Sequence, residues 1–291
     1  MTSVKELSKK TVLTLKNEGM GAVLKKAKHK ICGEQEVHVE YELGKIFKDV
    51  LFINGCDASV PHPARYRVTH QREQLEAHNV STDQVFYADL QLDQVRFYRT
   101  FIFFRCPYTD TIGEFINIAK ELNKKVLFDI DDLVIDTKYT DTIKYLSALK
   151  KEEKELYDDG VRRMGRTLSL CDAAITTTER LAEELGHYVS EVFINRNTAS
   201  DEMYALSEKA WREKKREDKT VGIGYFSGSM THNDDFLLVL PALQEIMENN
   251  SNVRLHVVGE LDLPNELVKV QSQIVVHPFV YWRELPKLIS Q

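Results

Sequence analysis

The chain has 291 residues, 43% of them hydrophobic, with a formal net charge of −6 and an isoelectric point near 5.9. This composition can fill one or two cores, which excludes a disordered chain, and its acidic balance argues against a general nucleic-acid binder. Four widely spaced cysteines indicate neither a disulfide framework nor a zinc site, and they favour a reducing, cytoplasmic compartment.

The first 45 residues are predicted to form a basic helical segment. Residues 1–30 contain eight lysines and only two acidic residues, Glu6 and Glu18. A basic helix that also carries Leu13 and Leu24 predicts peripheral contact with an anionic membrane surface. The alternative is a solvated helix that packs on its own domain. No apolar run reaches the roughly 18 residues of a membrane span, and no secretory signal pattern is seen.

Residues 46–200 alternate between short apolar runs and longer amphipathic segments. Such alternation predicts βαβ units around a parallel sheet, and therefore a Rossmann-like domain. In chain order, the sequence predicts the strand DVLFING, the helix RYRVTHQREQLEAH, the strands QVFYADL and TFIFFRC, the helix IGEFINIAKELNK, the strand KVLFDID, a long helical stretch over 140–170, the strand DAAITTT, the helix ERLAEELG and the strand EVFIN.

The alternation stops at residues 201–219 and restarts over 220–291. The intervening segment is dense in charge and predicts a linker, in part helical. The later residues predict the strand TVGIGYFSGS, the helix DFLLVLPALQEIMEN, the strands VRLHVVGE and QIVVHPFV, and a final helix WRELPKLIS. Pro241 lies inside the first of these helices and is expected to kink it or to mark its start.

The segment VLFDIDDLVIDT places Asp129, Asp131 and Asp132 at the end of an apolar strand. An Asp-x-Asp at a strand end is typical of magnesium-dependent phosphatases, in which the first aspartate attacks phosphorus. It is also typical of transferases that hold a metal ion against a sugar diphosphate. The rest of the chain lacks the late acidic loop that the first chemistry needs, and two successive α/β segments do not suit the second. Asp129 is compatible with a structural role, as a cap for neighbouring backbone N–H groups.

Polar side chains follow several predicted strands, at the edge where open parallel sheets bind ligands. Arginine recognises a diphosphate or carboxylate with two parallel hydrogen bonds, so arginines at this edge predict acceptor binding. The candidates in the first domain are Arg65, Arg67, Arg105, Asp131 and Asp132. In the second domain, the small-residue loop SGSMTHND precedes a helix and offers backbone N–H groups for a phosphate.

Several segments, in the same order as here, resemble bacterial glycosyltransferases of the large group 1 or family 4 class. They are PHPARYRVTHQREQL, VLFDIDDLVID, ITTTERLAEEL, IGYFSGSMTHNDDFLLVLPAL, VRLHVVGELDLP and VHPFVYWRELPKLI. Within that class the sequence resembles the branch that builds cell-wall, capsular and rhamnose-containing polysaccharides. The resemblance implies the GT-B fold, which is α/β with two Rossmann-like domains and parallel sheets, the second of them incomplete here.

The resemblance implies that the first domain holds a polysaccharide or lipid-linked glycan acceptor, with Asp131 and Asp132 lining the catalytic cleft. The second domain would hold a nucleotide diphosphate sugar as donor, and no metal ion or further cofactor is implied. The donor-binding residues would be Gly224, Ser227, Gly228, Thr231, His232 and Asn233. Many relatives carry Arg or Lys within the stretch from Met230 to Asn233, and a protonated His232 is the expected substitute.

Relatives in this class also carry a Glu-x7-Glu motif further along the second domain than this sequence extends. We therefore expect a fragment of a longer cytoplasmic enzyme, at the inner face of the membrane, which is inactive in transfer by itself. A competing hypothesis is a non-catalytic module that binds the acceptor or a partner protein. The magnesium-dependent phosphatase is the less favoured alternative.

Overall fold

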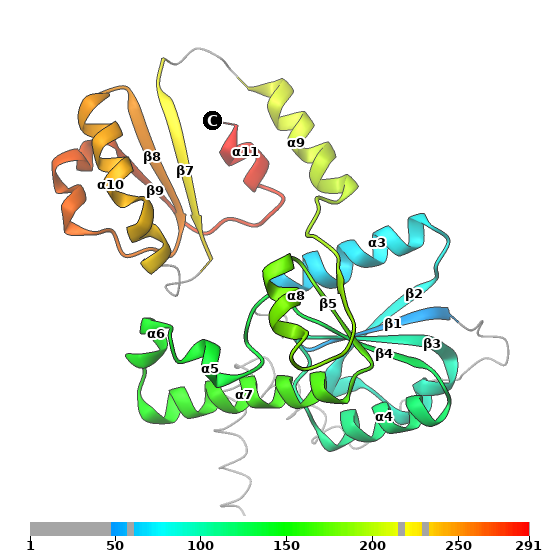
Figure 1. The fold of residues 1–291 in the computed structure, drawn as a ribbon. Coiled ribbons are helices and arrows are strands. Elements are labelled where there is room, and N and C mark those ends of the chain that lie inside the picture. Colours follow the sequence, from blue (N-terminus) through cyan, green and yellow to red (C-terminus); the bar gives the residue numbers. More distant parts are fainter. Residues whose placement is uncertain (1–47, 57–60, 215–218, 229–232, 291) are drawn as a thin grey trace, which may run out of the picture.

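The computed structural model describes residues 48–56, 61–214, 219–228 and 233–290 (Figure 1). The basic segment, with its predicted membrane contact, lies outside the described residues, as do Thr231 and His232. None of the described helices is long and apolar enough to cross a bilayer.

The first domain contains a six-stranded parallel sheet with the strand order β2-β1-β3-β4-β5-β6. The predicted parallel sheet is therefore confirmed. Its central strands are apolar on both faces because helices cover both sides, as parallel sheets require. The strands are β1 (Lys48–Asn54), β2 (Thr82–Phe86), β3 (Tyr98–Phe104), β4 (Lys125–Asp129), β5 (Ala173–Thr176) and β6 (Val192–Ile194).

Helices cover the two faces of this sheet unequally (Figure 1). One face packs α4, α7 and α8 over the larger core, in which Phe101, Phe103 and Phe115 meet edge to face. The other face packs the helix that follows β1 over a smaller core around Phe52 and Phe104. The helical elements are α2 (Pro61–Ala64), the π-helical η1 (Arg65–Thr69), α3 (His70–Ala77), η2 (Tyr87–Asp89), η3 (Leu92–Phe97), α4 (Asp110–Glu121), α5 (Thr137–Thr140), α6 (Lys144–Ser147), α7 (Lys151–Leu170) and α8 (Glu179–Leu185).

One prediction about the helices needs correction, and the structure makes a second one more specific. The stretch over 140–170 is not one helix, because it divides into the end of α5, the short α6 and the long α7. The predicted linker 201–219 is mostly the helix α9 (Asp201–Glu213), which begins where the Ser200 Oγ accepts a hydrogen bond from the Met203 N–H at 3.2 Å.

The second domain contains a three-stranded parallel sheet in the order β7-β8-β9, covered on one face by α10 and η5. The helix α10 continues through Pro241, so this proline does not mark its start. We call the opposite face the open face, because Phe226 on it is 49% exposed. The elements are β7 (Val221–Ser227), α10 (Asn233–Asn249), β8 (Val253–Gly259), η5 (Asn265–Gln273), β9 (Ile274–His277) and α11 (Leu285–Ile289).

Candidate functional site

The first sheet changes its winding direction between β1 and β3. The chain steps from β1 to β2 on one side and then returns to β3 on the other. Open α/β sheets bind ligands outside the carboxyl ends of their strands at such a point. Gly55 follows β1 there, and its N–H donates to the Phe104 carbonyl oxygen at 2.8 Å. A Cβ atom at Gly55 would lie 2.1 Å from the Arg105 carbonyl oxygen, so this close approach requires glycine.

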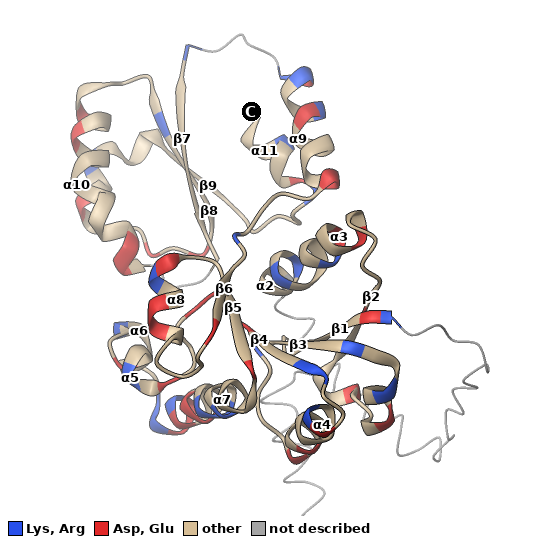
Figure 2. Cartoon of the chain, turned by 45° about the vertical axis from the view of Figure 1, so that its right-hand side comes forward, with Lys and Arg blue, Asp and Glu red and all other residues tan. Residues whose placement is uncertain are grey.

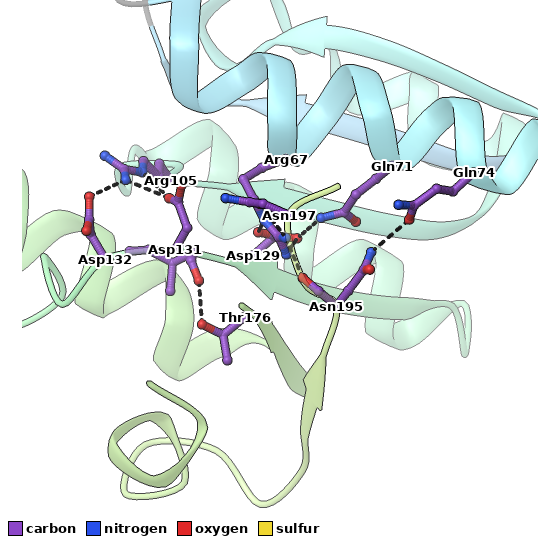
Figure 3. A network of polar contacts seen from close by, with 11 residues as sticks. Arg67, Gln71, Gln74, Arg105, Asp129, Asp131, Asp132, Thr176, Asn195 and Asn197 are labelled. Atoms are coloured by element: carbon purple, nitrogen blue, oxygen red, sulfur yellow. Dashed lines mark hydrogen bonds and ion pairs between the residues drawn. The ribbon is translucent and has the colours of Figure 1, made fainter. Parts of the chain in front are cut away.

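Arg105, Asp131 and Asp132 form a charged cluster at this switch point (Figure 3). The Arg105 Nε donates to the Asp131 Oδ1 at 2.8 Å, and its Nη2 pairs with Asp131 at 2.6 Å and also with Asp132. The Asp131 side chain is 15% exposed, whereas that of Asp132 is 61% exposed. The structure therefore brings three predicted site residues together and leaves the Asp132 carboxylate open to solvent.

Neighbouring residues affect both the backbone conformation of Arg105 and the pKa of its side chain. Arg105 has a φ of 42°, in the left-handed region that non-glycine residues rarely adopt, and its N–H donates to the Asp129 carbonyl oxygen at 3.0 Å. Burial acts to lower the pKa of the Arg105 guanidinium, but the charges of Asp131 and Asp132 outweigh burial and raise this pKa. Burial also raises the pKa of the nearby Cys56 thiol to about 11, so this cysteine is not an activated nucleophile.

Asp129 has a structural environment that separates it from this cluster. Its carboxylate is fully buried and accepts two hydrogen bonds from Arg67, Nε to Oδ1 at 2.8 Å and Nη2 to Oδ2 at 2.9 Å. Gln71 donates a third, at 2.6 Å. Burial raises the pKa of Asp129 to about 6, although Arg67 and Gln71 act to lower it. A carboxylate enclosed in this way is not placed to attack an external phosphate, so the structure does not support Asp129 as the nucleophile of a phosphatase.

The structure places Arg67, a predicted acceptor-binding residue, in the interior of the first domain. Its side chain is 0% exposed, and all three of its nitrogen atoms donate to groups of the same chain. The sequence reasoning placed Arg67 at a surface helix start. It could not show that the π-helical turn of η1 directs this side chain inward, towards the end of β4.

Arg65 lies at the junction of the two domains. Its guanidinium carbon is 4.6 Å from the centre of the Trp282 ring, in a cation–π contact with the segment that follows β9. Arg283 stacks on the same ring at 4.5 Å. The predicted acceptor-binding role of Arg65 therefore competes with a contact between domains, which the sequence reasoning missed because Trp282 is more than two hundred residues away.

The carboxyl ends of both sheets lie on the sides that face each other. Lys144, on α6 beyond β4, forms an ion pair with Asp234 at the start of α10, with an N–O distance of 3.1 Å. The rings of His62 and Phe279 lie 5.0 Å apart, centre to centre. Loops from the carboxyl end of each sheet thus meet at this junction (Figure 1).

The predicted donor residues of the second domain do not all lie in one place. Gly224 is inside β7, on the open face of the sheet, where the Phe226 ring would contact a Cβ atom at 2.8 Å. Gly228 follows the strand and has open space around it. The Asn233 side chain is bound to Asp262, with Nδ2 donating to Oδ2 at 2.9 Å.

Close approach of the backbone accounts for the glycine at the carboxyl end of β8. Gly259 has a φ of 94°, and a Cβ atom there would lie 2.1 Å from the Ser227 carbonyl oxygen, so the ends of β7 and β8 approach closely. Over residues 48–56, 61–214, 219–228 and 233–290, no group of three or more histidine, cysteine or acidic side chains is arranged to hold a metal ion.

Two histidines meet on the open face of the second sheet. His256 on β8 and His277 on β9 have stacked rings, with Nδ1 and Nε2 2.9 Å apart. Burial lowers the pKa of His256, and His277 and Arg254 lower it further. At this distance a ring N–H of one histidine can donate to the facing nitrogen of the other, whereas two imidazolium rings would repel each other.

We therefore expect the second domain to lose stability as the pH falls from about 7.5 to about 5.5. A histidine with a lowered pKa holds fewer protons in the folded than in the unfolded state, so its stabilising contribution is present at neutral pH and lost on acidification. His277→Gln should reduce this loss. Thermal melts of both proteins over this range measure it, and identical pH profiles would contradict the role of the pair.

The chain was compared with protein families, curated proteins and solved structures. No protein-family model matches the sequence, and no curated protein is similar to it. Among solved structures, HepE of Anabaena with UDP and glucose is 10% identical, with a TM-score of 0.41, over 83% of this chain and 71% of that chain. A UDP-glucosyltransferase of Polygonum tinctorium is 10% identical, with a TM-score of 0.37, over 80% of this chain and 71% of that one. A Listeria monocytogenes protein described as a UDP-N-acetylglucosamine 2-epimerase is 12% identical, with a TM-score of 0.41, over 84% of this chain and 72% of that chain.

Proposed function

We propose that this protein takes part in glycosyl transfer from a nucleotide diphosphate sugar to a growing cell-surface polysaccharide or a lipid-linked glycan. The acceptor binds at the carboxyl edge of the first sheet and the donor at that of the second, as in a GT-B enzyme. The reaction takes place in the cytoplasm at the inner face of the membrane. The donor sugar is a substrate, and the proposal requires no metal ion or further cofactor.

The observation that carries this proposal is the cluster of Arg105, Asp131 and Asp132 at the switch point of the first sheet. Asp131 is fixed by the Arg105 guanidinium, and the exposed Asp132 carboxylate is free on one side to accept a hydrogen bond from a sugar hydroxyl. Lys144, on α6 beyond β4, pairs with Asp234 at the start of α10, so the start of α10 lies near the carboxyl side of the first sheet. Fixed carboxylates near a bound donor can orient an acceptor hydroxyl for attack, and such positioning accounts for much of an enzyme's rate.

We expect Asp132→Asn to lower the affinity for an acceptor glycan about tenfold, which corresponds to about 1.4 kcal/mol, while binding of UDP is unchanged. Amide substitution removes the charge but retains the shape, and the exposed position makes a change in melting temperature small. Calorimetry with soluble oligosaccharides from bacterial surface polysaccharides, and separately with UDP and UDP-glucose, measures both affinities.

The matched control is Asp159→Asn on α7, an exposed carboxylate that pairs only loosely with Arg163, at 3.9 Å. It changes the net charge equally and should affect neither affinity. Equal glycan binding by the wild type and by Asp132→Asn would place the acceptor elsewhere. A wild type that binds neither a glycan nor a nucleotide would contradict the proposed function as a whole.

A specific observation favours the non-catalytic module as a second candidate. The donor loop has acidic neighbours, since Asp234 and Asp235 begin α10 and Asp262 binds Asn233 (Figure 2). Negative charge at this position opposes the binding of a diphosphate. A protein that binds glycan with the same Asp132 dependence, but binds no nucleotide, would have this function instead.

A further inference from the structure

The segment that joins the first sheet to α9 is held by polar contacts from the helix η1–α3. Residues 195–198 follow β6 without regular secondary structure and lead to Ser200, which caps α9. They form the crossover segment through which the chain passes towards the second sheet (Figure 1). The direction in which α9 leaves the first domain therefore depends on how these four residues are held.

Arg67 joins this crossover segment to the core of the first sheet (Figure 3). Two of its nitrogen atoms bind the buried Asp129 carboxylate at the end of β4. The third, Nη1, donates to the Asn195 carbonyl oxygen at 2.6 Å and to the Asn197 Oδ1 at 3.2 Å. A guanidinium is rigid and planar, so the position of Asp129 determines where these two acceptors can lie.

Two further side chains of α3 hold the same segment. The His70 Nδ1–H donates to the Thr198 carbonyl oxygen at 2.9 Å. The Gln74 Nε2 donates to the Thr198 Oγ1 at 2.8 Å, and its Oε1 accepts from the Asn195 Nδ2 at 3.2 Å. Every residue of the segment except Arg196 is thus hydrogen-bonded to η1–α3.

A pocket borders the crossover segment on the side of α3. It has a volume of about 200 Å³, is open to solvent on one side and lies between α3 and the strands β3, β5 and β6. Its lining includes Gln71, Gln74, Phe193 and Asn195. The hydrogen bonds from Gln74 and Asn195 therefore border open space on this side of the crossover segment.

The helix α9 transmits this position to the second domain. Glu202, in its first turn, binds Arg283 through two ion-pair contacts, at 2.5 and 2.9 Å. Arg283 in turn stacks on Trp282, whose ring also contacts Arg65 of the first domain. A change in the direction of α9 would therefore displace the segment 281–283 relative to Arg65.

We propose that Arg67, His70 and Gln74 are positioning residues that fix the angle between the two sheets by clamping the crossover segment 195–198. The clamp goes beyond the proposed function, because it concerns the arrangement of the domains whatever reaction they perform. Domain closure in two-domain proteins is absorbed by a few residues at the ends of elements, and this segment is such a place. Loosening the clamp should broaden the range of interdomain angles without unfolding either domain.

The test avoids Arg67, whose removal affects the core, and uses the double variant Gln74→Ala with Asn197→Ala. Spin labels on noncanonical residues at Glu121 of α4 and Glu248 of α10, both exposed, report the distance between the domains. We expect the distance distribution measured by pulsed dipolar spectroscopy to broaden about twofold relative to the wild type.

Arg72→Ala is the matched control, since Arg72 lies on the same helix but binds Thr82 and Glu76 within the first domain. It should leave the distribution unchanged. An unchanged distribution in the double variant would overturn the proposal, even if its melting temperature fell, because this would show a structural role only. Broadening by Arg72→Ala to the same extent would also overturn it.

Discussion

Arg67→Ala is expected to lower the free energy of unfolding of the first domain by about 3–5 kcal/mol, the usual cost of removing one partner of a buried ion pair. Arg67 and Asp129 are both 0% exposed. The alanine would leave the Asp129 carboxylate buried with Gln71 as its remaining side-chain partner. It would also release Asn195 from the core of the sheet. Urea denaturation monitored by circular dichroism measures the change.

The pH dependence of this loss distinguishes a buried charge from lost packing. Burial already raises the pKa of Asp129 to about 6 in the presence of Arg67, and removing the guanidinium should raise it further. A carboxyl group with a raised pKa takes up a proton on folding, so its destabilising effect grows as the pH rises from the lower pKa of the unfolded chain up to the pKa of the folded state, and it is constant above that. The loss in free energy of unfolding caused by Arg67→Ala should therefore be smaller near pH 5 than near pH 8. A loss of stability that does not change with pH would indicate that only side-chain packing was removed.

Two further variants serve as controls for Arg67→Ala. Arg72→Ala removes an arginine from the same helix, but its ion pair with Glu76 is partly exposed, so we expect a loss of less than about 1 kcal/mol. The double variant Arg67→Met with Asp129→Leu removes both charges and should recover part of the lost stability. A double variant less stable than Arg67→Ala would contradict the assignment of the loss to an unpaired carboxylate.

Phe236→Ala is expected to destabilise the second domain by about 3–5 kcal/mol, because it leaves a large cavity in a small core. The Phe236 side chain is 0% exposed and meets the Tyr225 ring edge to face, with centres 4.8 Å apart. Its cluster shares no residue with the cores of the first sheet. The first domain should therefore keep its own unfolding transition.

Limited proteolysis tests this separation and the predicted boundaries together. We expect Phe236→Ala to be cleaved early within or after 201–219, leaving a resistant fragment from about residue 46 to 200. Leu238→Ala, at a position 81% exposed on the same helix, should behave like the wild type. Simultaneous loss of both domains in Phe236→Ala would show one cooperative unit and would contradict the division at the linker.

Periodicity and strand-end chemistry made much of the fold and part of the site predictable. Apolar runs such as TFIFFRC and KVLFDID correspond to β3 and β4, because central strands covered on both faces must be continuously apolar. The grouping of Arg105 with Asp131 and Asp132 was predictable because parallel strands end at the same edge. Gly55 and Gly259 were not identified, since their roles depend on backbone approaches between strands that no local pattern reveals.

The amino-acid sequence by itself determined two successive α/β segments and the carboxylates at the end of β4, because strand and helix periods are local properties. Only the tertiary structure decided which of these carboxylates is available. Asp129 and Asp131 are two residues apart, yet Asp129 is enclosed by Arg67 and Gln71 while Asp131 lies beside Arg105 at the edge. The inward direction of Arg67 and the stacking of Arg65 on Trp282 depend on contacts between segments distant in sequence. Burial and charge pairing arise from such contacts, so the division between structural and exposed polar residues is a property of the folded chain.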